Sequence, residues 1–176
     1  LEAFHPILKS QQKLEILPHS TISQNSPAGS TLKYIANPNT EIENEIVDDF
    51  ALFDTWEEKY QYIIEIGQKL KPLAAEFKVD ENKIKGCQSS VWLTANENNG
   101  IIEFFADSDS VFVKGEIALL MEVLSGQPAE AIVNAELGFI DQIGLRSHMA
   151  QTRANGLAAM IKQMKLYAVG FQHKNM

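Results

Sequence analysis

Cysteine is nearly absent from this sequence, because Cys87 is the only one among its 176 residues. A single cysteine excludes a disulfide within the chain and any zinc or iron–sulfur site that needs several cysteines of the chain. A free thiol of this kind survives in a reducing compartment, so the predicted location is cytoplasmic. The central question is whether the thiol is a reagent or a small apolar side chain in the packing.

Long apolar runs and an excess of positive charge are also absent. No apolar run reaches the roughly 18 residues that a membrane-spanning helix needs. The 15 Lys and Arg residues and 23 Asp and Glu residues give a formal net charge of −8, which disfavours nucleic acid and anionic membranes as partners. No glycine-rich phosphate-binding motif occurs, and the scattered histidines offer too few metal ligands. We therefore expect no cofactor and no metal on this chain.

The composition changes near residue 40. Four of the six prolines lie in residues 1–40, and the stretch Ser20–Ser30 is polar. Such a segment buries too little apolar surface to offset the entropy cost of ordering, so residues 1–40 are predicted to be a flexible tail. Residues 41–176 are the predicted folded domain.

The pattern of the folded domain predicts an α+β fold, in which helices pack on a small antiparallel β-sheet. Two short strands are predicted at 91–95 and 101–106, with the loop 96–100 between them and a turn at Asp107–Ser110. Thr55 and Glu58 form a predicted capping box at a helix start. Apolar residues at helical spacing predict helices at about 42–53, 55–70, 117–124, 129–134 and from an N-cap at Thr152 to about 171.

The local sequence around Cys87 leaves two interpretations open. Gly86 lets the backbone turn tightly before the sulfur, and Lys83 and Lys85 are close enough in sequence to lower the pKa of the thiol. Residue types alone give equal support to a reactive thiol and to a small buried hydrophobe.

His148 and Arg153 are the other candidates for chemistry. A Cys87/His148 pair would suggest a thiol hydrolase, although a histidine that packs or caps in a loop is the more common role. Arg153 lies at the predicted start of the last helix, where the helix dipole disfavours a cation. That position indicates pairing with a carboxylate or with an incoming anion.

Several blocks of the folded domain occur in a recognisable order over about residues 46–165. They are Trp56-Glu57-Glu58-Lys59-Tyr60, Gly86-Cys87-Gln88-Ser89 with Val91-Trp92-Leu93, Asp107-Ser108-Asp109, Val113-Lys114-Gly115, and Thr152-Arg153 with Asn155-Gly156-Leu157. In these blocks the chain resembles the SufE family, the sulfur acceptors that partner cysteine desulfurases in iron–sulfur cluster assembly. Gln151 departs from the pattern, since many relatives have proline there, and residues 1–40 match nothing in the family.

The resemblance implies a fold like that of the scaffold protein IscU and a persulfide-forming role for Cys87. It further implies that Gly86, Gln88 and Ser89 shape the loop and that His148 and Arg153 line the neighbouring partner-binding surface. The chain would then be no enzyme but a sulfur-transfer accessory protein. It would take sulfur from a SufS-type cysteine desulfurase, stimulate that desulfurase and deliver sulfur to a SufBCD-type scaffold. Pyridoxal phosphate would belong to the desulfurase.

Other interpretations stay open at this point. The related CsdE branch, which serves a CsdA-type desulfurase, shares the same motif. A Cys87/His148 thiol hydrolase and an interaction domain with a packed cysteine are the alternatives from other functional classes. The sequence leaves the oligomeric state open between a monomer and a homodimer.

Overall fold

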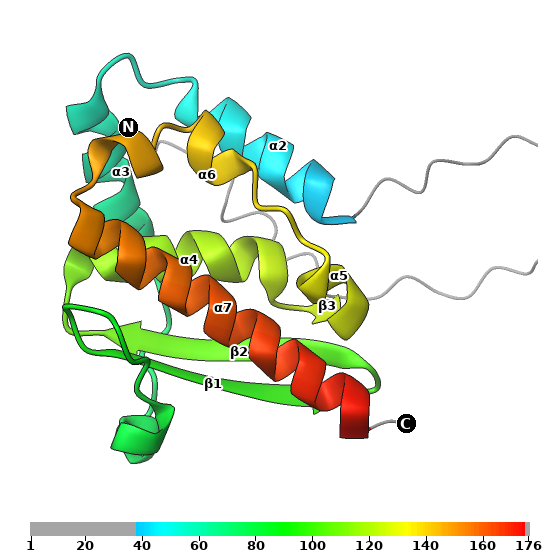
Figure 1. Ribbon diagram of the computed structural model, residues 1–176. Helices are drawn as coiled ribbons and strands as arrows, with labels where there is room; N and C mark the ends of the chain where they lie inside the picture. Colours follow the sequence, from blue (N-terminus) through cyan, green and yellow to red (C-terminus); the bar gives the residue numbers. More distant parts are fainter. Residues whose placement is uncertain (1–37, 175–176) are drawn as a thin grey trace, which may run out of the picture. The chain divides into compact units, whose positions relative to one another are not determined.

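The structure is a computed structural model that describes residues 38–174, and its α-helices lie over one face of a small sheet (Figure 1). This arrangement confirms the predicted α+β class. Helix α2 begins at Pro38, inside the predicted tail, and residues 1–37 of that tail lie outside the described residues. In chain order the elements are α2 (Pro38–Phe50), α3 (Trp56–Gln68), η1 (Ala75–Phe77), η2 (Asp80–Asn82), β1 (Val91–Asn98), β2 (Ile101–Ser108), α4 (Val111–Leu124), β3 (Gln127–Pro128), α5 (Ala129–Val133), α6 (Phe139–Gln142), η3 (Arg146–His148) and α7 (Gln151–Lys174).

The sheet is antiparallel, with the strand order β1-β2-β3. Strands β1 and β2 pair from Val91↔Ser108 to Asn98↔Ile101, so the predicted five-residue loop is wrong. Only Asn99 and Gly100 connect the strands, with φ of 52° and 81°. Asn-Gly tolerates these positive values, and the resulting tight turn matches the twist of the strands, so pairing continues to the turn.

The main core lies between the sheet and the helices. Strand residues that alternate along β1 and β2 point to this side, and α4 contributes its apolar face. Members of this layer that are at most 3% exposed include Val91, Leu93, Ile102, Phe104, Ala106, Ile117, Leu120, Val123 and Leu124. Burial of these side chains fixes α4 and the hairpin relative to each other.

Helices α3 and α4 approach each other closely at Gly67 and Gly115. A Cβ atom added to Gly115 would overlap the backbone of Ile63, and one added to Gly67 would overlap the backbone of α4. The two glycines therefore allow backbone-to-backbone contact. The predicted capping box at Thr55 is confirmed, with Glu58 N 3.3 Å from Thr55 Oγ1, and it defines where α3 begins.

The predicted turn at 107–110 is wrong in its first half. Asp107 and Ser108 belong to β2, and only Asp109 and Ser110 lie in the turn. The side chain of Asp107 is buried, and its two oxygens lie 2.7 Å from Lys78 Nζ and 3.3 Å from Lys114 Nζ. Burial alone would raise the pKa of Asp107, but the Lys78, Ser108 and Lys114 hydrogen bonds outweigh it and hold the pKa below its ordinary value. Asp107 thus ties β2 to the segment before β1 and to α4.

Two short elements, β3 and α6, were not predicted, since each is too brief to carry a hydrophobic period. Helix α7 begins at Gln151, so Thr152 is in its first turn rather than at the N-cap.

Candidate functional site: the Cys87 cavity

Cys87 lies in the loop between η2 and β1, which is anchored at both ends. Before the cysteine, Ile84 N donates to Val91 O at 2.8 Å. After it, Ser90 N donates to Asp109 Oδ1 at 3.0 Å, and Ser90 O accepts from Ser108 Oγ at 2.8 Å. Between these anchors Gly86 has φ of 91°, the left-handed conformation that glycine adopts most easily. The anchors hold the base of the loop and leave the segment 85–89 as its tip.

The tip of this loop rests against α7. Cys87 Sγ donates to the backbone oxygen of Gly156 at 3.5 Å, and the cysteine is partly exposed. The thiol borders a cavity of about 50 Å³, roughly the space of one or two water molecules. We call it the Cys87 cavity, and its lining residues are Cys87, Gln88, Ser89, Val113, Glu116, Thr152, Arg153, Gly156, Leu157 and Met160.

Glu116 is a member of this lining that sequence reasoning missed. Its residue is 1% exposed, and Oε1 has no hydrogen-bond partner within the described part of the chain. The signal was present in the sequence, because Glu116 lies three residues after Val113 and four before Leu120, on the apolar stripe of its helix. An acidic side chain on a buried stripe is rare unless it is paired.

Burial and charge shift the pKa of two side chains that line the cavity, Cys87 and Glu116. Burial raises the pKa of Cys87, and the nearby Glu116 carboxyl raises it further. Burial also raises the pKa of Glu116 to about 7, against the opposing effect of the Arg153 guanidinium. The expectation that Lys83 and Lys85 lower the pKa of the thiol is therefore wrong in this state. The ammonium of Lys83 instead lies 6.0 Å from the centre of the Trp92 ring.

Arg153 projects from the first turn of α7 into the lining of the cavity. Its guanidinium carbon lies 4.9 Å from the centre of the Phe112 ring, and its charge acts on Glu116. The guanidinium of Arg153, which is unfavourable at a helix start, thus lies near the carboxyl group of Glu116 on α4. Arg153 itself is exposed, so it remains accessible to an anion from solvent.

The structure brings together four of the six residues singled out from the sequence. Gln88, Ser89 and Arg153 line the cavity with Cys87, and Gly86 shapes the turn that leads to it. His148 does not line it. The imidazole of His148 stacks on Trp56 with 4.3 Å between ring centres, and its Nδ1 lies 2.8 Å from Gly144 O. Its role in this structure is packing and local hydrogen bonding.

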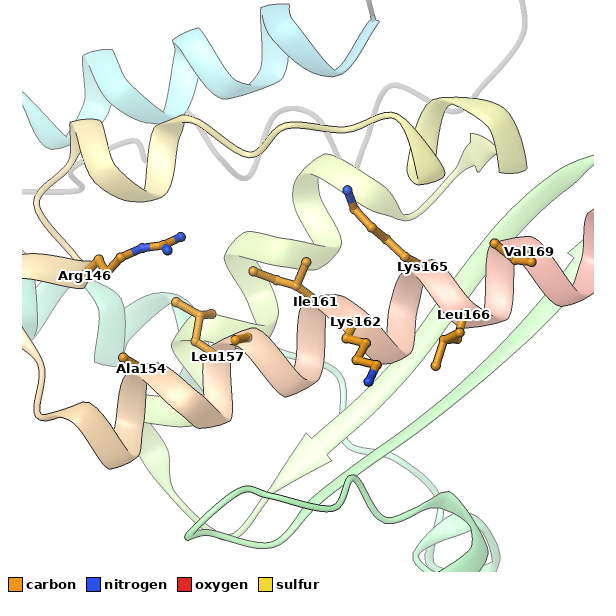
Figure 2. A pocket seen from close by; sticks show the side chains of 9 residues that line it. Arg146, Ala154, Leu157, Ile161, Lys162, Lys165, Leu166 and Val169 are labelled. Atoms are coloured by element: carbon orange, nitrogen blue, oxygen red, sulfur yellow. The ribbon is translucent and has the colours of Figure 1, made fainter.

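A larger hollow of about 420 Å³ follows α7 and is bordered by apolar side chains together with Arg146, Lys162 and Lys165 (Figure 2). Leu157 lines both hollows. The larger one contains no thiol and no carboxyl group, and Lys165 Nζ donates to Ala135 O at 2.6 Å. Of these two hollows, only the smaller one is lined by both a thiol and a carboxyl group.

The part of the chain that the structure describes holds no cluster of three His, Cys, Asp or Glu side chains that could bind a metal ion. Across residues 38–174 we also find no helix with both the length and the apolarity required to traverse a bilayer.

Comparison with known proteins matches residues 44–168 to the family model "SufE: Fe-S metabolism associated domain". The chain belongs to the SufE family. The match covers the hairpin, α4, most of α7 and every lining residue of the Cys87 cavity. It confirms the resemblance drawn from the sequence and gives the chain a role in iron–sulfur metabolism.

Two curated relatives support membership of the SufE family. An uncharacterised SufE-like protein of Rhizobium meliloti is 37% identical over 132 residues, which are 72% of this chain and 94% of the relative. A SufE-like protein of Rhizobium etli is 38% identical over 127 residues, or 69% of this chain and 86% of the relative. A solution structure of a hypothetical protein from Thermus thermophilus has the same fold. It has a TM-score of 0.61 at 21% identity and covers 73% of this chain and 94% of its own.

Proposed function

We propose that this chain is a sulfur acceptor and carrier that works with a cysteine desulfurase. In this proposal Cys87 receives the sulfur, the chain stimulates the desulfurase, and the sulfur then passes to a SufB-type scaffold for cluster assembly. The observation that carries the proposal is the position of the only cysteine. Within the SufE domain, Cys87 lies at the tip of a loop and directly follows a glycine. It borders a small cavity and is partly open to solvent.

The chemical step needs no external oxidant or reductant. The Cys87 thiol loses its proton, and the thiolate attacks the outer sulfur of the persulfide on the desulfurase. A bond forms between Cys87 Sγ and that sulfur while the sulfur–sulfur bond of the donor breaks. The donor cysteine leaves with the electron pair as a thiolate and takes up a proton. Cys87 then carries a persulfide.

The free protein keeps the thiol partly sheltered, which supports a carrier that reacts mainly with its partner. The raised pKa of Cys87 leaves little thiolate at neutral pH, and the contact with Gly156 holds the sulfur against α7. We expect the loop tip at 85–89 to swing out on docking. Arg153, exposed at the edge of the cavity, is the residue we assign to the docked desulfurase surface.

The packing of His148 gives no support to a thiol hydrolase, because its ring stacks on Trp56 and does not line the Cys87 cavity. Within the SufE family, partnership with a SufS-type desulfurase and a CsdE-like partnership remain the two forms of the proposal.

The decisive experiment is the mass of the intact protein after incubation with a cysteine desulfurase, pyridoxal phosphate and free cysteine. Wild type should gain one sulfur atom, and Cys87→Ser should fold normally and gain none. Added sulfur on Cys87→Ser, or none on wild type with a working desulfurase, would overturn the proposal.

A second measurement tests the sheltered thiol. Alkylation of Cys87 should be slow in the free protein and faster once the desulfurase is bound. Equal rates in the two states would show that docking does not expose the sulfur.

A further inference from the structure

Glu116 occupies a position that packing alone does not explain. It lies on the apolar stripe of α4, and its residue is 1% exposed, yet Oε1 finds no hydrogen-bond donor in the described part of the chain. A buried acceptor without a partner costs stability, and a buried charge costs more. The side chain lines the Cys87 cavity, so the unsatisfied oxygen is close to the one thiol of the chain.

The thiol does not use Glu116 as its hydrogen-bond acceptor in this state. Cys87 Sγ donates to Gly156 O instead, on the side of α7. Glu116 therefore acts on Cys87 through its charge. If both groups were ionised, two anions would share a cavity of about 50 Å³ that has little water to screen them.

Few charged side chains of the described residues lie around Glu116. The titratable groups that line the cavity are Cys87 from the loop, Glu116 from α4 and Arg153 from α7. Arg153 offsets part of the negative charge, but it is exposed and so is partly screened by solvent. Lys114, the neighbour of Glu116 on α4, is engaged with Asp107 at 3.3 Å.

We propose that Glu116 is a positioning residue that keeps Cys87 a neutral, unreactive thiol while the loop rests in the cavity. The thiol becomes nucleophilic when the loop carries it out of the cavity, away from both the burial and this carboxylate that raise its pKa. The consequence for sulfur transfer rests on the proposed function above, whereas the effect on the thiol itself does not. A carrier built in this way resists small oxidants and alkylating agents and responds to its docked partner.

The test is the alkylation rate of the free protein by iodoacetamide from pH 5.5 to pH 10. In wild type, Glu116 ionises near pH 7 and suppresses the thiolate, so the logarithm of the rate should rise with a slope below one through that region. Glu116→Gln removes the charge and should restore a slope of one. At pH 8 the variant should react about tenfold faster, and at pH 5.5 the two rates should be equal.

Two further variants make the result specific. Glu103→Gln removes the same charge from an exposed position on β2 and should leave the wild-type profile unchanged. Glu116→Leu places an apolar side chain among apolar neighbours and should reproduce the fast profile, which covers the case in which the buried amide of glutamine impairs folding. Wild-type-like profiles for both Glu116 variants would overturn the inference.

The sulfur-transfer assay separates this inference from the proposed function. With the desulfurase, Glu116→Gln should still gain one sulfur atom, because the loop has left the cavity at that stage. Loss of transfer in this variant but not in wild type would mean that Glu116 takes part in transfer itself, and the resting role would be wrong. If wild type gains no sulfur, the proposed function fails, and the alkylation profiles alone decide the role of Glu116.

Discussion

The buried carboxyl group of Glu116 should make the stability of this protein depend on pH in a direction opposite to that of most carboxylates. Its pKa is about 7 in the folded chain and 4.5 ordinarily, so between these values the folded state holds a proton that the unfolded state has lost. Stability is therefore highest below pH 4.5 with respect to this group and falls as the pH rises towards and past 7. Each unit of pKa difference is worth ~1.4 kcal/mol, which gives a total loss of roughly 3 kcal/mol.

The assay is urea denaturation of wild type and Glu116→Gln at pH 5 and pH 8. We expect the free energy of unfolding of wild type to fall by roughly 2–3 kcal/mol relative to the variant between these pH values. The comparison cancels the packing cost of the glutamine amide, because that cost is the same at both pH values. Glu103→Gln, an exposed charge change, should behave like wild type. Equal pH dependence in wild type and Glu116→Gln would refute the assignment of a buried, titrating carboxyl.

Three other substitutions test the helix packing, the buried ion pair and the partner-binding role proposed above. Gly115→Ala should lower the free energy of unfolding by about 3 kcal/mol in urea titrations, since its Cβ would overlap α3, whereas Gly170→Ala on open α7 surface should raise it slightly. Asp107→Asn should cost about 2 kcal/mol, because two lysines lose their partner, and the variant should lack the stability loss that wild type shows below about pH 4. Arg153→Ala should keep the fold by circular dichroism but reduce desulfurase stimulation about fivefold in a sulfide-release assay; unchanged stimulation would contradict its assignment.

Local sequence patterns predicted the elements that depend on local interactions. The Thr55 capping box, the hairpin and the amphipathic helices were all recognisable, because hydrogen-bonding side chains and apolar periods act over a few residues. Errors arose where a neighbour in space decided the outcome. Asp107 carries a residue type typical of turns, but Lys78 and Lys114 hold it inside β2.

The sequence by itself determined the family, the α+β class and the identity of the one thiol, since ordered motifs and a single cysteine are properties of the chain alone. Only the tertiary structure decided what surrounds that thiol. Helix α4 brings Glu116 and α7 brings Arg153 to Cys87 from positions 29 and 66 residues further along the chain. The pKa of a thiol depends on such neighbours and on burial. The lysines close to Cys87 in sequence therefore predicted a lowered pKa, whereas burial and Glu116 raise it.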